Sequence, residues 1–349
     1  MMVILFRVDA NERTGIGHVT RCFALAQGLK AAGHKILWLG KLFKPEMVQA
    51  IQKQQVPILE EQNFSSIEEE INTISRYTAQ MNIDWVVLDG YQFDEAYQVQ
   101  LRKKCHVHLL WIDDPACIQS PADVVVNQNI YATPYLYEGK VSNNVSLLTG
   151  TAFALLRPEF MGEVPQRQFN KVQQVLLTLG GTQPFELLSR FVRLLDDLKE
   201  DFALDVVIGS GSYQPLLAYA KEHCASGRRI NLCISPGAQE MRQLMAKADL
   251  AISAAGSTCW ELCRLGTPML LVILADNQEK VAEEMGRQAV AINAGWANQL
   301  TDQQFQEIFL KLFYDQKLRS QFSQTAQSRV DGRGVRRVIE KLEELVGVK

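Results

Sequence analysis

Short apolar runs alternate with amphipathic stretches along the first third of the chain. The run VILFRVD (3–9) predicts a buried strand, and apolar side chains at helical spacing over 18–33 predict a helix that Gly33 ends. The same alternation predicts strands at 34–40, 56–60, 84–90 and 107–114, with helices at 44–54, 65–82 and 93–104 between them. Uninterrupted apolar strands separated by helices indicate a parallel sheet with helices on both faces.

A polar segment with prolines, LLRPEFMGEVPQRQFNK (155–171), interrupts this pattern and is the expected linker. Beyond it, apolar runs predict strands at 172–181, 204–211, 230–235, 249–256, 268–275 and 289–295, and the tail from Thr301 predicts two or three helices. We therefore expect an α/β protein of two Rossmann-like domains, residues 1–160 and 161–349, whose parallel sheets face a cleft. Ligands of such sheets bind at the carboxyl ends of the strands.

Composition narrows the class of protein. Of the 349 residues, 47% are hydrophobic and 21% charged, as in an ordinary soluble globular protein. A net charge of −3 and the lack of a Lys/Arg block argue against nucleic acid or a membrane surface as partner. No window approaches the roughly 18 apolar residues of a membrane span. The seven scattered cysteines are typical of reduced thiols, so we expect a cytoplasmic protein; a monomer is compatible with the sequence, which leaves the oligomeric state open.

The loop after the first strand carries the most informative motif, TGIGHVTRC (14–22). A glycine turn that opens a helix offers free N–H groups and partial positive charge, which suit an anion. A dinucleotide fingerprint is not matched, because Thr20 stands where the third glycine belongs and the second strand ends in WLGK without an acidic residue. No G-x-x-x-x-G-K-[ST] phosphate loop occurs either.

His18 stands at the start of this helix, where the helix dipole disfavours the imidazolium form. A neutral ring is what a general base needs, although His18 could equally cap the helix. Asp9 could orient the other ring nitrogen, but capping of the turn is the more ordinary role for it. Arg21 could bind a phosphate or pair with Glu12.

Two glycine-rich turns follow strands of the second half. In LTLGGTQPFELL (177–188), Gly180 and Gly181 would let a ligand approach the backbone closely, and Thr182 could cap the helix or donate to a phosphate. This two-glycine turn alone is a weak signal.

The turn in SAAGSTCWELCRLGTP (253–268) is more specific. Gly256, Ser257 and Thr258 supply N–H groups and hydroxyls at a helix start, a cradle suited to a diphosphate. Glu261 follows one turn later, where its carboxylate could accept from ribose hydroxyls or complete a capping box.

Other polar residues at strand ends are weaker candidates. Asn277 or Gln278 could bind a sugar or cap a helix, and Asp89 and Tyr91 end another predicted strand. Adjacent strand residues point in opposite directions, which argues against a joint acid–base role for the pair 113–114 in WIDDP.

Two cysteines, Cys259 and Cys263, share a helix face but have no second ligand pair, so packing is a better reading than zinc. We expect neither a metal nor a cofactor.

Taken together, the motifs resemble those of one family. They are RVDA…GIGHVTRC, LDGYQFD, WIDDP, NQN, GTAFALLRPEF, LGGT, SAAGSTCWELCRLGTP and ADNQ, in this order over about residues 3–300. The family is that of the UDP-2,4-diacetamido-2,4,6-trideoxy-L-altropyranose hydrolases of pseudaminic acid biosynthesis, grouped with spore coat polysaccharide glycosyltransferase-like proteins. The resemblance implies the two-domain GT-B fold, with the catalytic histidine and sugar site in the first domain and the UDP site in the second.

The resemblance also implies a role for each matching position. His18 would activate water against the anomeric carbon. The substrate-binding residues would be Gly17, Arg21, Tyr91, Asn277 and Gln278, and the nucleotide-binding residues Gly180, Gly181, Thr182, Gly256, Ser257, Thr258 and Glu261. The chain departs from the family at Ala255, where relatives often carry a second glycine; one added methyl leaves nucleotide binding in place.

Three functions are open at this stage. The leading hypothesis is metal-independent hydrolysis of the UDP-linked sugar to free sugar and UDP. A GT-B glycosyltransferase would use the same UDP-sugar donor but pass the sugar to an acceptor, so an acceptor-free assay separates the two. A non-catalytic sensor would bind the UDP-sugar whether or not His18 is present.

Overall fold

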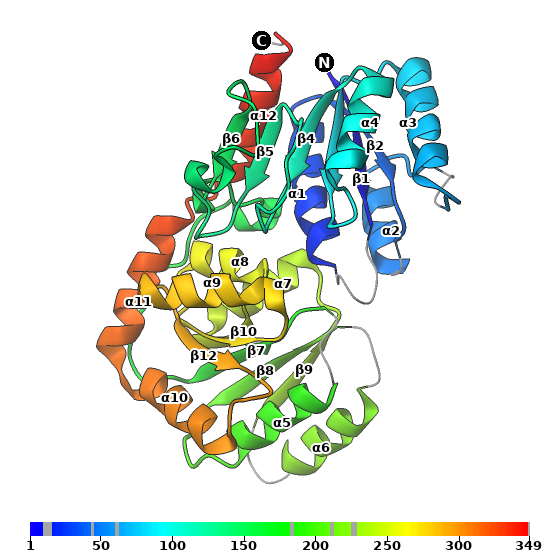
Figure 1. Cartoon of the computed structure of the whole chain (residues 1–349). Coiled ribbons are helices and arrows are strands. Elements are labelled where there is room, and N and C mark those ends of the chain that lie inside the picture. The colour runs from blue at the N-terminus through cyan, green and yellow to red at the C-terminus, as the bar shows by residue number, and fades with distance from the viewer. Residues whose placement is uncertain are drawn as a thin grey trace. The chain divides into compact units, whose positions relative to one another are not determined.

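The computed structural model describes residues 1–9, 16–42, 45–59, 63–181, 185–209, 213–224 and 229–347 (Figure 1). The chain forms two compact units. Unit 1 comprises Met1–Pro158 and Gly332–Lys349, and unit 2 comprises Glu159–Asp331. The chain passes from the first to the second inside the proline-containing segment 155–171. Each unit is built on its own six-stranded sheet.

The sheet of unit 1 has the strand order β2-β1-β3-β4-β5-β6, and every neighbouring pair is parallel. The strands are β1 (Val3–Val8), β2 (Lys35–Leu39), β3 (Trp85–Asp89), β4 (His108–Ile112), β5 (Val124–Asn127) and β6 (Ser146–Thr149). All five residues of β3 and all four of β5 are buried, because helices cover both faces of the sheet (Figure 1).

The helices of unit 1 begin and end where local chemistry directs. They are α1 (Gly17–Ala31), α2 (Pro45–Lys53), α3 (Ile67–Met81), α4 (Glu95–Cys105) and α12 (Gly334–Leu345), with short 3-10 turns η1 (Pro134–Tyr137) and η2 (Thr151–Phe153). Ser66 and Asp94 cap α3 and α4 by accepting from backbone N–H groups. Gly33 follows the end of α1 with φ +89°, a left-handed conformation that glycine adopts without strain, as predicted.

The strands of unit 1 differ from the prediction in two ways: one predicted strand does not form, and two short strands were not predicted. The segment 56–60 was expected to form a strand, but its described part makes only an isolated bridge between Trp38 and Ile58. Conversely, β5 and β6 were not predicted. Each has four residues, which is too short for a periodic pattern; β5 pairs with β4 and β6 pairs with β5.

Unit 2 has the strand order β12-β11-β10-β7-β8-β9, again with parallel neighbours. Its strands are β7 (Gln174–Thr178), β8 (Ala203–Ile208), β9 (Ile230–Ile234), β10 (Leu250–Ala254), β11 (Met269–Ile273) and β12 (Ile292–Trp296). The helices are α5 (Phe185–Asp196), α6 (Gln214–Cys224), α7 (Ala238–Lys247), α8 (Thr258–Leu265), α9 (Asp276–Arg287), α10 (Asp302–Tyr314) and α11 (Gln316–Arg329), after the 3-10 turn η3 (Pro158–Phe160). All six strands of this unit were predicted.

The core of unit 2 contains alternate residues of its strands, packed against helices on one face of the sheet. Alternate residues of β7 and β8, among them Val175, Leu177 and Val206, pack with Phe191 of α5 and Phe309 of α10. Alternation along each strand places these side chains on one face of the sheet.

The last helix, α12, belongs to unit 1, which corrects the expectation that residues 161–349 form one domain. It packs on α1, where a Cβ at Gly28 would lie only 2.4 Å from Cγ1 of Val335. Glu343 accepts from Nε2 of His34 at 3.0 Å. The chain returns to unit 1 because α12 buries an apolar face against α1. The sequence shows that this helix is amphipathic, but it does not show which element its apolar face contacts.

Candidate active site

The order in which the chain adds strands to the sheet of unit 1 reverses beside β1. The chain runs from β1 outward to β2 and then returns to the other side of β1 as β3. Loops that leave adjacent strands in opposite directions open a crevice at their carboxyl ends, where ligands bind in such sheets. Gly17 and His18 begin α1 on the first of these connections, and Asp89 ends β3 on the other side.

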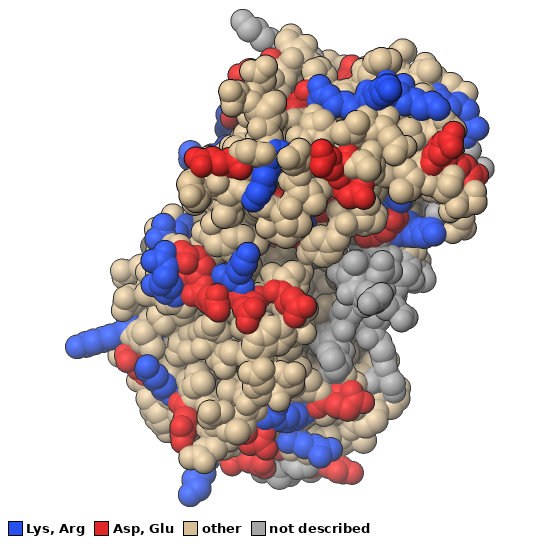
Figure 2. Space-filling view, in the orientation of Figure 1, with Lys and Arg blue, Asp and Glu red and all other residues tan. Residues whose placement is uncertain are grey.

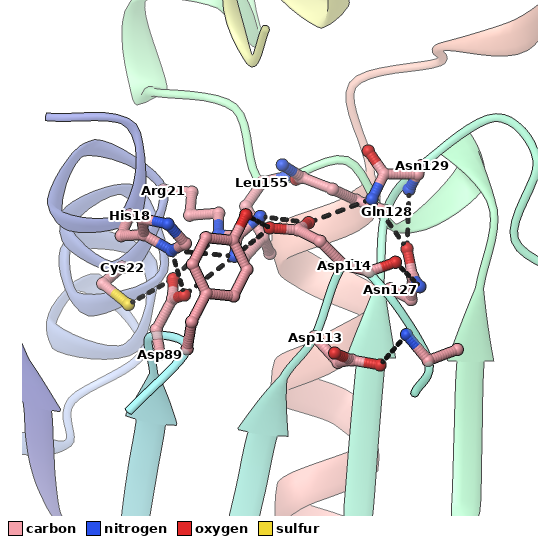
Figure 3. A network of polar contacts seen from close by, with 12 residues as sticks. His18, Arg21, Cys22, Asp89, Asp113, Asp114, Asn127, Gln128, Asn129 and Leu155 are labelled. Atoms are coloured by element: carbon pink, nitrogen blue, oxygen red, sulfur yellow. Dashed lines mark hydrogen bonds and ion pairs between the residues drawn. The ribbon is translucent and has the colours of Figure 1, made fainter. Parts of the chain in front are cut away.

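His18 contacts Asp89 directly. Nδ1 of the ring lies 2.5 Å from Oδ1 of the carboxylate, and both side chains are buried (Figure 3). The N-cap of α1 is Ile16, without a side-chain cap hydrogen bond, so His18 does not cap the helix. Asp89, and not Asp9, orients the ring.

The charge state of Asp89 determines the tautomer of His18. Burial alone would raise the pKa of Asp89, but the charges of Arg21 and then His18, with their hydrogen bonds, outweigh it and hold this pKa well below its usual range. Nη2 of Arg21 also lies 3.1 Å from Nδ1 of His18, but its two N–H groups already donate to Asp89 and Asp114. An ionised carboxylate can only accept, so Nδ1 of His18 carries a proton and donates it to Asp89. In the neutral ring Nε2 is then the basic nitrogen.

Arg21 lies between two carboxylates. Its Nε and Nη2 donate to the two oxygens of Asp89, both at 2.7 Å, while Nη1 and Nη2 donate to the two oxygens of Asp114 at 2.7 and 3.0 Å (Figure 3). The side chain is buried, with 6% of its surface exposed. Burial lowers the pKa of Arg21, but Asp114 and Asp89 outweigh that effect and raise it.

This geometry gives Arg21 two carboxylate partners, and its contact with the substrate stays a prediction. Four of its five N–H groups donate to the two carboxylates, and its charge is matched by theirs. The alternative partner, Glu12, lies outside the described residues.

Asp114 follows β4 and collects polar side chains from two further loops. Nδ2 of Asn129 donates to its Oδ1 at 2.9 Å, and the hydroxyl of Tyr91 lies 3.3 Å from its Oδ2. Asn127 and Tyr131 donate to its backbone carbonyl at 3.0 and 2.9 Å. Burial alone would raise the pKa of Asp114, but the charge of Arg21 lowers it.

Tyr91 is the exposed member of this cluster. Its ring meets that of His18 edge to face, with centroids 5.1 Å apart and planes at 90°. Its exposed fraction is 49%, while His18 below it is 6% exposed. The structure therefore places two of the predicted residues, His18 and Tyr91, side by side.

Asp113 faces a different environment from its neighbour. Its Oδ2 accepts from the hydroxyl of Tyr137 at 2.7 Å and from the backbone N–H of Ala116 at 2.9 Å. Burial raises the pKa of Asp113 to about 6. The pair 113–114 thus has separate partners, as the alternation of strand residues predicted.

Asp9 binds the loops on either side of it. It pairs with buried Arg7 at 2.7 Å, accepts from the backbone N–H of Lys41 at 2.7 Å, and accepts from Nε2 of Gln92 at 3.1 Å. These contacts join Asp9 to β1 and to the loops after β2 and β3, whereas the turn at 10–15 that it was expected to cap lies outside the described residues.

In unit 2, the described residues among those predicted to bind the nucleotide follow two neighbouring strands, at the carboxyl ends of the sheet. β10 pairs with β7 on one side and β11 on the other, so the turns after these three strands are neighbours at their carboxyl ends. The strand order reverses between β7 and β10, which makes this the switch point of unit 2. Gly180 has φ +93°, and a Cβ at Gly256 would meet nothing within 4 Å.

The start of α8 does not form the capping box considered from the sequence. Ser257 is the N-cap residue and makes no side-chain cap hydrogen bond, and Glu261 is buried. Thr182 lies outside the described residues. Asn277 is exposed near the start of α9, whereas Oε1 of Gln278 accepts from the backbone N–H of Leu274 at 3.0 Å.

The sequence did not assign the cluster's three further members to the site: Asp89 was only a weak candidate at a strand end, Asp114 was considered only as a pair with Asp113, and Asn129 was given no role. Each follows or ends a strand of the parallel sheet, and that shared position was the available signal. The motifs LDGYQFD, WIDDP and NQN contain them, but the contacts join residues that are far apart in the chain.

The described part of the chain contains no cluster of three His, Cys, Asp or Glu side chains that could hold a metal ion. Cys259 and Cys263 are buried free thiols there. Among the same residues, no helix has the length and apolar character needed to cross a bilayer. Positive and negative side chains are interspersed on the face shown in Figure 2.

Comparison with solved structures identifies the architecture. Acinetobacter baumannii MurG superposes with a TM-score of 0.70 at 19% identity, over 98% of this chain and 99% of that one. The UDP co-structure of Staphylococcus aureus MnaA gives 0.66 at 14% identity, over 100% and 98%. The chain has the GT-B fold.

Sequence relatives of this GT-B chain agree with the resemblance drawn from its motifs. Residues 175–340 match the glycosyltransferase family 28 C-terminal domain. The UDP-2,4-diacetamido-2,4,6-trideoxy-beta-L-altropyranose hydrolase of Campylobacter jejuni is 24% identical over 83% of this chain and 98% of its own length. The spore coat polysaccharide biosynthesis protein SpsG of Bacillus subtilis is 22% identical over 97% and 96%. The resemblance to this group is confirmed.

A third relative is longer. An uncharacterized protein of Methanocaldococcus jannaschii is 27% identical over 79% of this chain, which spans 56% of that protein's length.

Proposed function

We propose that this GT-B protein hydrolyses a UDP-linked sugar to free sugar and UDP, with His18 as the general base. One observation carries the proposal: at the switch point of unit 1, Asp89 holds the His18 ring through Nδ1 and leaves Nε2 as its basic atom. A carboxylate that orients a histidine in this way is the arrangement of an acid–base pair.

The reaction follows from the roles of the atoms. Nε2 of His18 takes a proton from water as the water oxygen attacks the anomeric carbon. The bond between that carbon and the diphosphate oxygen breaks through an oxocarbenium-like state, and its electron pair leaves with UDP. Asp89 stabilises the imidazolium that forms.

Unit 2 would bind the nucleotide. The turns at Gly180 and Gly256 lie at its switch point, and N–H groups at the start of α8 suit the negative charge of the leaving diphosphate. We assign the diphosphate to Gly180, Gly181, Thr182, Gly256, Ser257 and Thr258, and the ribose to Glu261.

The sugar is proposed from the hydrolase relative. Its name specifies UDP-2,4-diacetamido-2,4,6-trideoxy-beta-L-altropyranose, and we propose the same substrate here, in pseudaminic acid biosynthesis. Gly17, Tyr91, Asn277 and Gln278 would contact the sugar. The six described cysteines are free thiols, which supports a cytoplasmic setting.

The test is an acceptor-free assay of the purified protein with this UDP-sugar, followed by NMR. Free sugar and UDP should appear in equal amounts. Absence of free sugar, despite UDP binding, would overturn the hydrolase proposal for this substrate.

A glycosyltransferase is the second candidate, favoured by the match of residues 175–340 to a glycosyltransferase domain. It would release UDP only when an acceptor is added, because the sugar passes to the acceptor and not to water. The same assay with and without acceptor therefore decides between them. A sensor would bind UDP-sugar with neither activity.

A further inference from the structure

We propose that Asp114 is a positioning residue for His18. It fixes the position of the Arg21 guanidinium beside Asp89, and it supplies a second negative charge that favours the imidazolium form of the base. The proposal rests on the assignment of His18 as base, but its test does not depend on turnover.

The geometry shows why Asp89 alone would not stabilise a positive charge on His18. The Arg21 guanidinium binds Asp89 through two N–H groups, both at 2.7 Å. This pairing keeps Asp89 ionised, and it also cancels the negative charge that Asp89 would otherwise present to His18. Asp114 takes the opposite edge of the same guanidinium at 2.7 and 3.0 Å.

Counting charges gives the consequence. Asp89, Asp114 and Arg21 together carry one negative charge, so a neutral His18 leaves the group at −1 and an imidazolium brings it to zero. Without the charge of Asp114 the corresponding values are zero and +1. His18, Arg21 and Asp89 are buried, and the side chain of Asp114 is 13% exposed. Screening by water is therefore weak, and the difference in charge acts on the His18 ring.

The groups that face His18 and its partners come from several elements. Arg21 and Cys22 belong to α1, Asp89 ends β3, Tyr91 follows it, and Asp114 follows β4. Cys22 donates to Oδ2 of Asp89 at 3.3 Å, and burial followed by the charge of Asp89 raises the pKa of its thiol, so it remains neutral. The hydroxyl of Tyr131 donates to the backbone of Asp114, and burial raises its pKa as well.

The amide of Asn129 fixes the orientation of the Asp114 carboxylate. It donates to Oδ1 of Asp114 at 2.9 Å while it also donates to Asn127 at 3.0 Å. The carboxylate therefore receives bonds from the guanidinium and from a buried amide, which holds it in one orientation.

The experiment is an NMR titration of the full chain labelled with ¹⁵N-histidine. The protein has five histidines, and the spectrum of His18→Gln identifies the His18 signals. In the parent protein, the ¹⁵N shifts should report a proton on Nδ1 in the neutral ring. In Asp114→Asn the titration midpoint of His18 should move to lower pH by about one unit.

The adjacent residue offers a matched control. Asp113→Asn removes a buried carboxylate next in the chain that contacts Tyr137 and Ala116 instead of Arg21, and it should leave the His18 midpoint in place. Asp114→Ser, which removes the charge with a different shape, should repeat the shift, and Asp114→Glu should restore most of it. Equal midpoints in the parent protein and in a folded Asp114→Asn or Asp114→Ser variant would overturn the proposal.

Kinetics provide the second readout. The acidic limb of the kcat/KM profile for the UDP-sugar should move with the NMR midpoint, with little change in KM. If no UDP-sugar is hydrolysed but the midpoint shifts, the proposed function fails and the inference about Asp114 stands. If hydrolysis occurs and the midpoint does not shift, the inference alone fails.

Discussion

The two units share a plan but differ at the carboxyl ends of their strands. Each has six parallel strands and one switch point. At that point unit 1 presents buried polar side chains, His18, Arg21 and Asp89, joined by hydrogen bonds. Unit 2 presents Gly180 and Gly256, where backbone is accessible and no Cβ stands in the way.

The contrast separates what a sheet provides from what side chains add. The strand order in unit 2, read from β9, is 3-2-1-4-5-6 within that unit, and in unit 1 it is 2-1-3-4-5-6. Both orders open a crevice beside the first strand of the unit. Topology therefore gives the position of each candidate site, while the residues at the strand ends give unit 1 the proposed acid–base pair and unit 2 the proposed anion cradle.

Removing the base should have the largest effect. His18→Gln keeps a polar side chain but cannot take the proton, and we expect kcat to fall about 10³-fold. The affinity for UDP, measured by calorimetry, should stay within about twofold, because unit 2 is unchanged. Retained turnover in the folded variant would contradict the division of roles.

The nucleotide cradle is tested by Gly256→Ala. A Cβ at this position meets nothing within 4 Å, so folding should be unaffected. Close approach of a diphosphate to the backbone would be obstructed, and we expect the Kd for UDP to rise about tenfold. Unchanged affinity would remove Gly256 from the proposed cradle, and equal unfolding midpoints are the control.

Asp113→Asn should change how stability depends on pH. The folded pKa of Asp113 is about 6, above the ordinary value near 3.9, so the folded state holds the proton more tightly. Its contribution to stability is therefore fully present below about pH 4 and is lost as pH rises through about 6.

The variant removes this loss. Asp113→Asn should raise the free energy of unfolding at pH 7 by about 2 kcal/mol and leave it unchanged at pH 4. Urea denaturation at the two pH values measures both quantities. An equal change at both pH values would show a packing effect instead of a proton-linked one.

The smallest expected effect concerns a helix cap. Ser257→Ala should alter the free energy of unfolding by less than about 0.5 kcal/mol, because Ser257 makes no cap hydrogen bond. Thr301→Ala is the comparison: Thr301 and Gln304 form a capping box at α10, and its loss should cost about 1 kcal/mol. Should Ser257→Ala also weaken UDP binding, its hydroxyl would serve the ligand.

The sequence predicted most of the sheet architecture because that information is local. Apolar runs of five or six residues identify strands such as β1 and β11, and Gly33 marks a helix end through its left-handed backbone. The four-residue strands β5 and β6 and the packing of α12 on α1 were not predicted, because neither produces a periodic pattern in the sequence.

The candidate site was predictable only in part for the same reason. His18 and Tyr91 sit in recognisable motifs, and their proximity follows from the order of β1 and β3. The partners of Arg21 are 68 and 93 residues away in the chain, and choosing two aspartates over a phosphate needs the positions of three strand ends.

The return of α12 to unit 1 has a consequence during translation. Unit 2 is a continuous stretch of chain, whereas unit 1 needs residues 334–345 to cover α1, the helix that bears His18. On the ribosome, unit 2 can therefore complete its fold before unit 1. A nascent chain would form the proposed site for UDP before it completes the proposed catalytic centre.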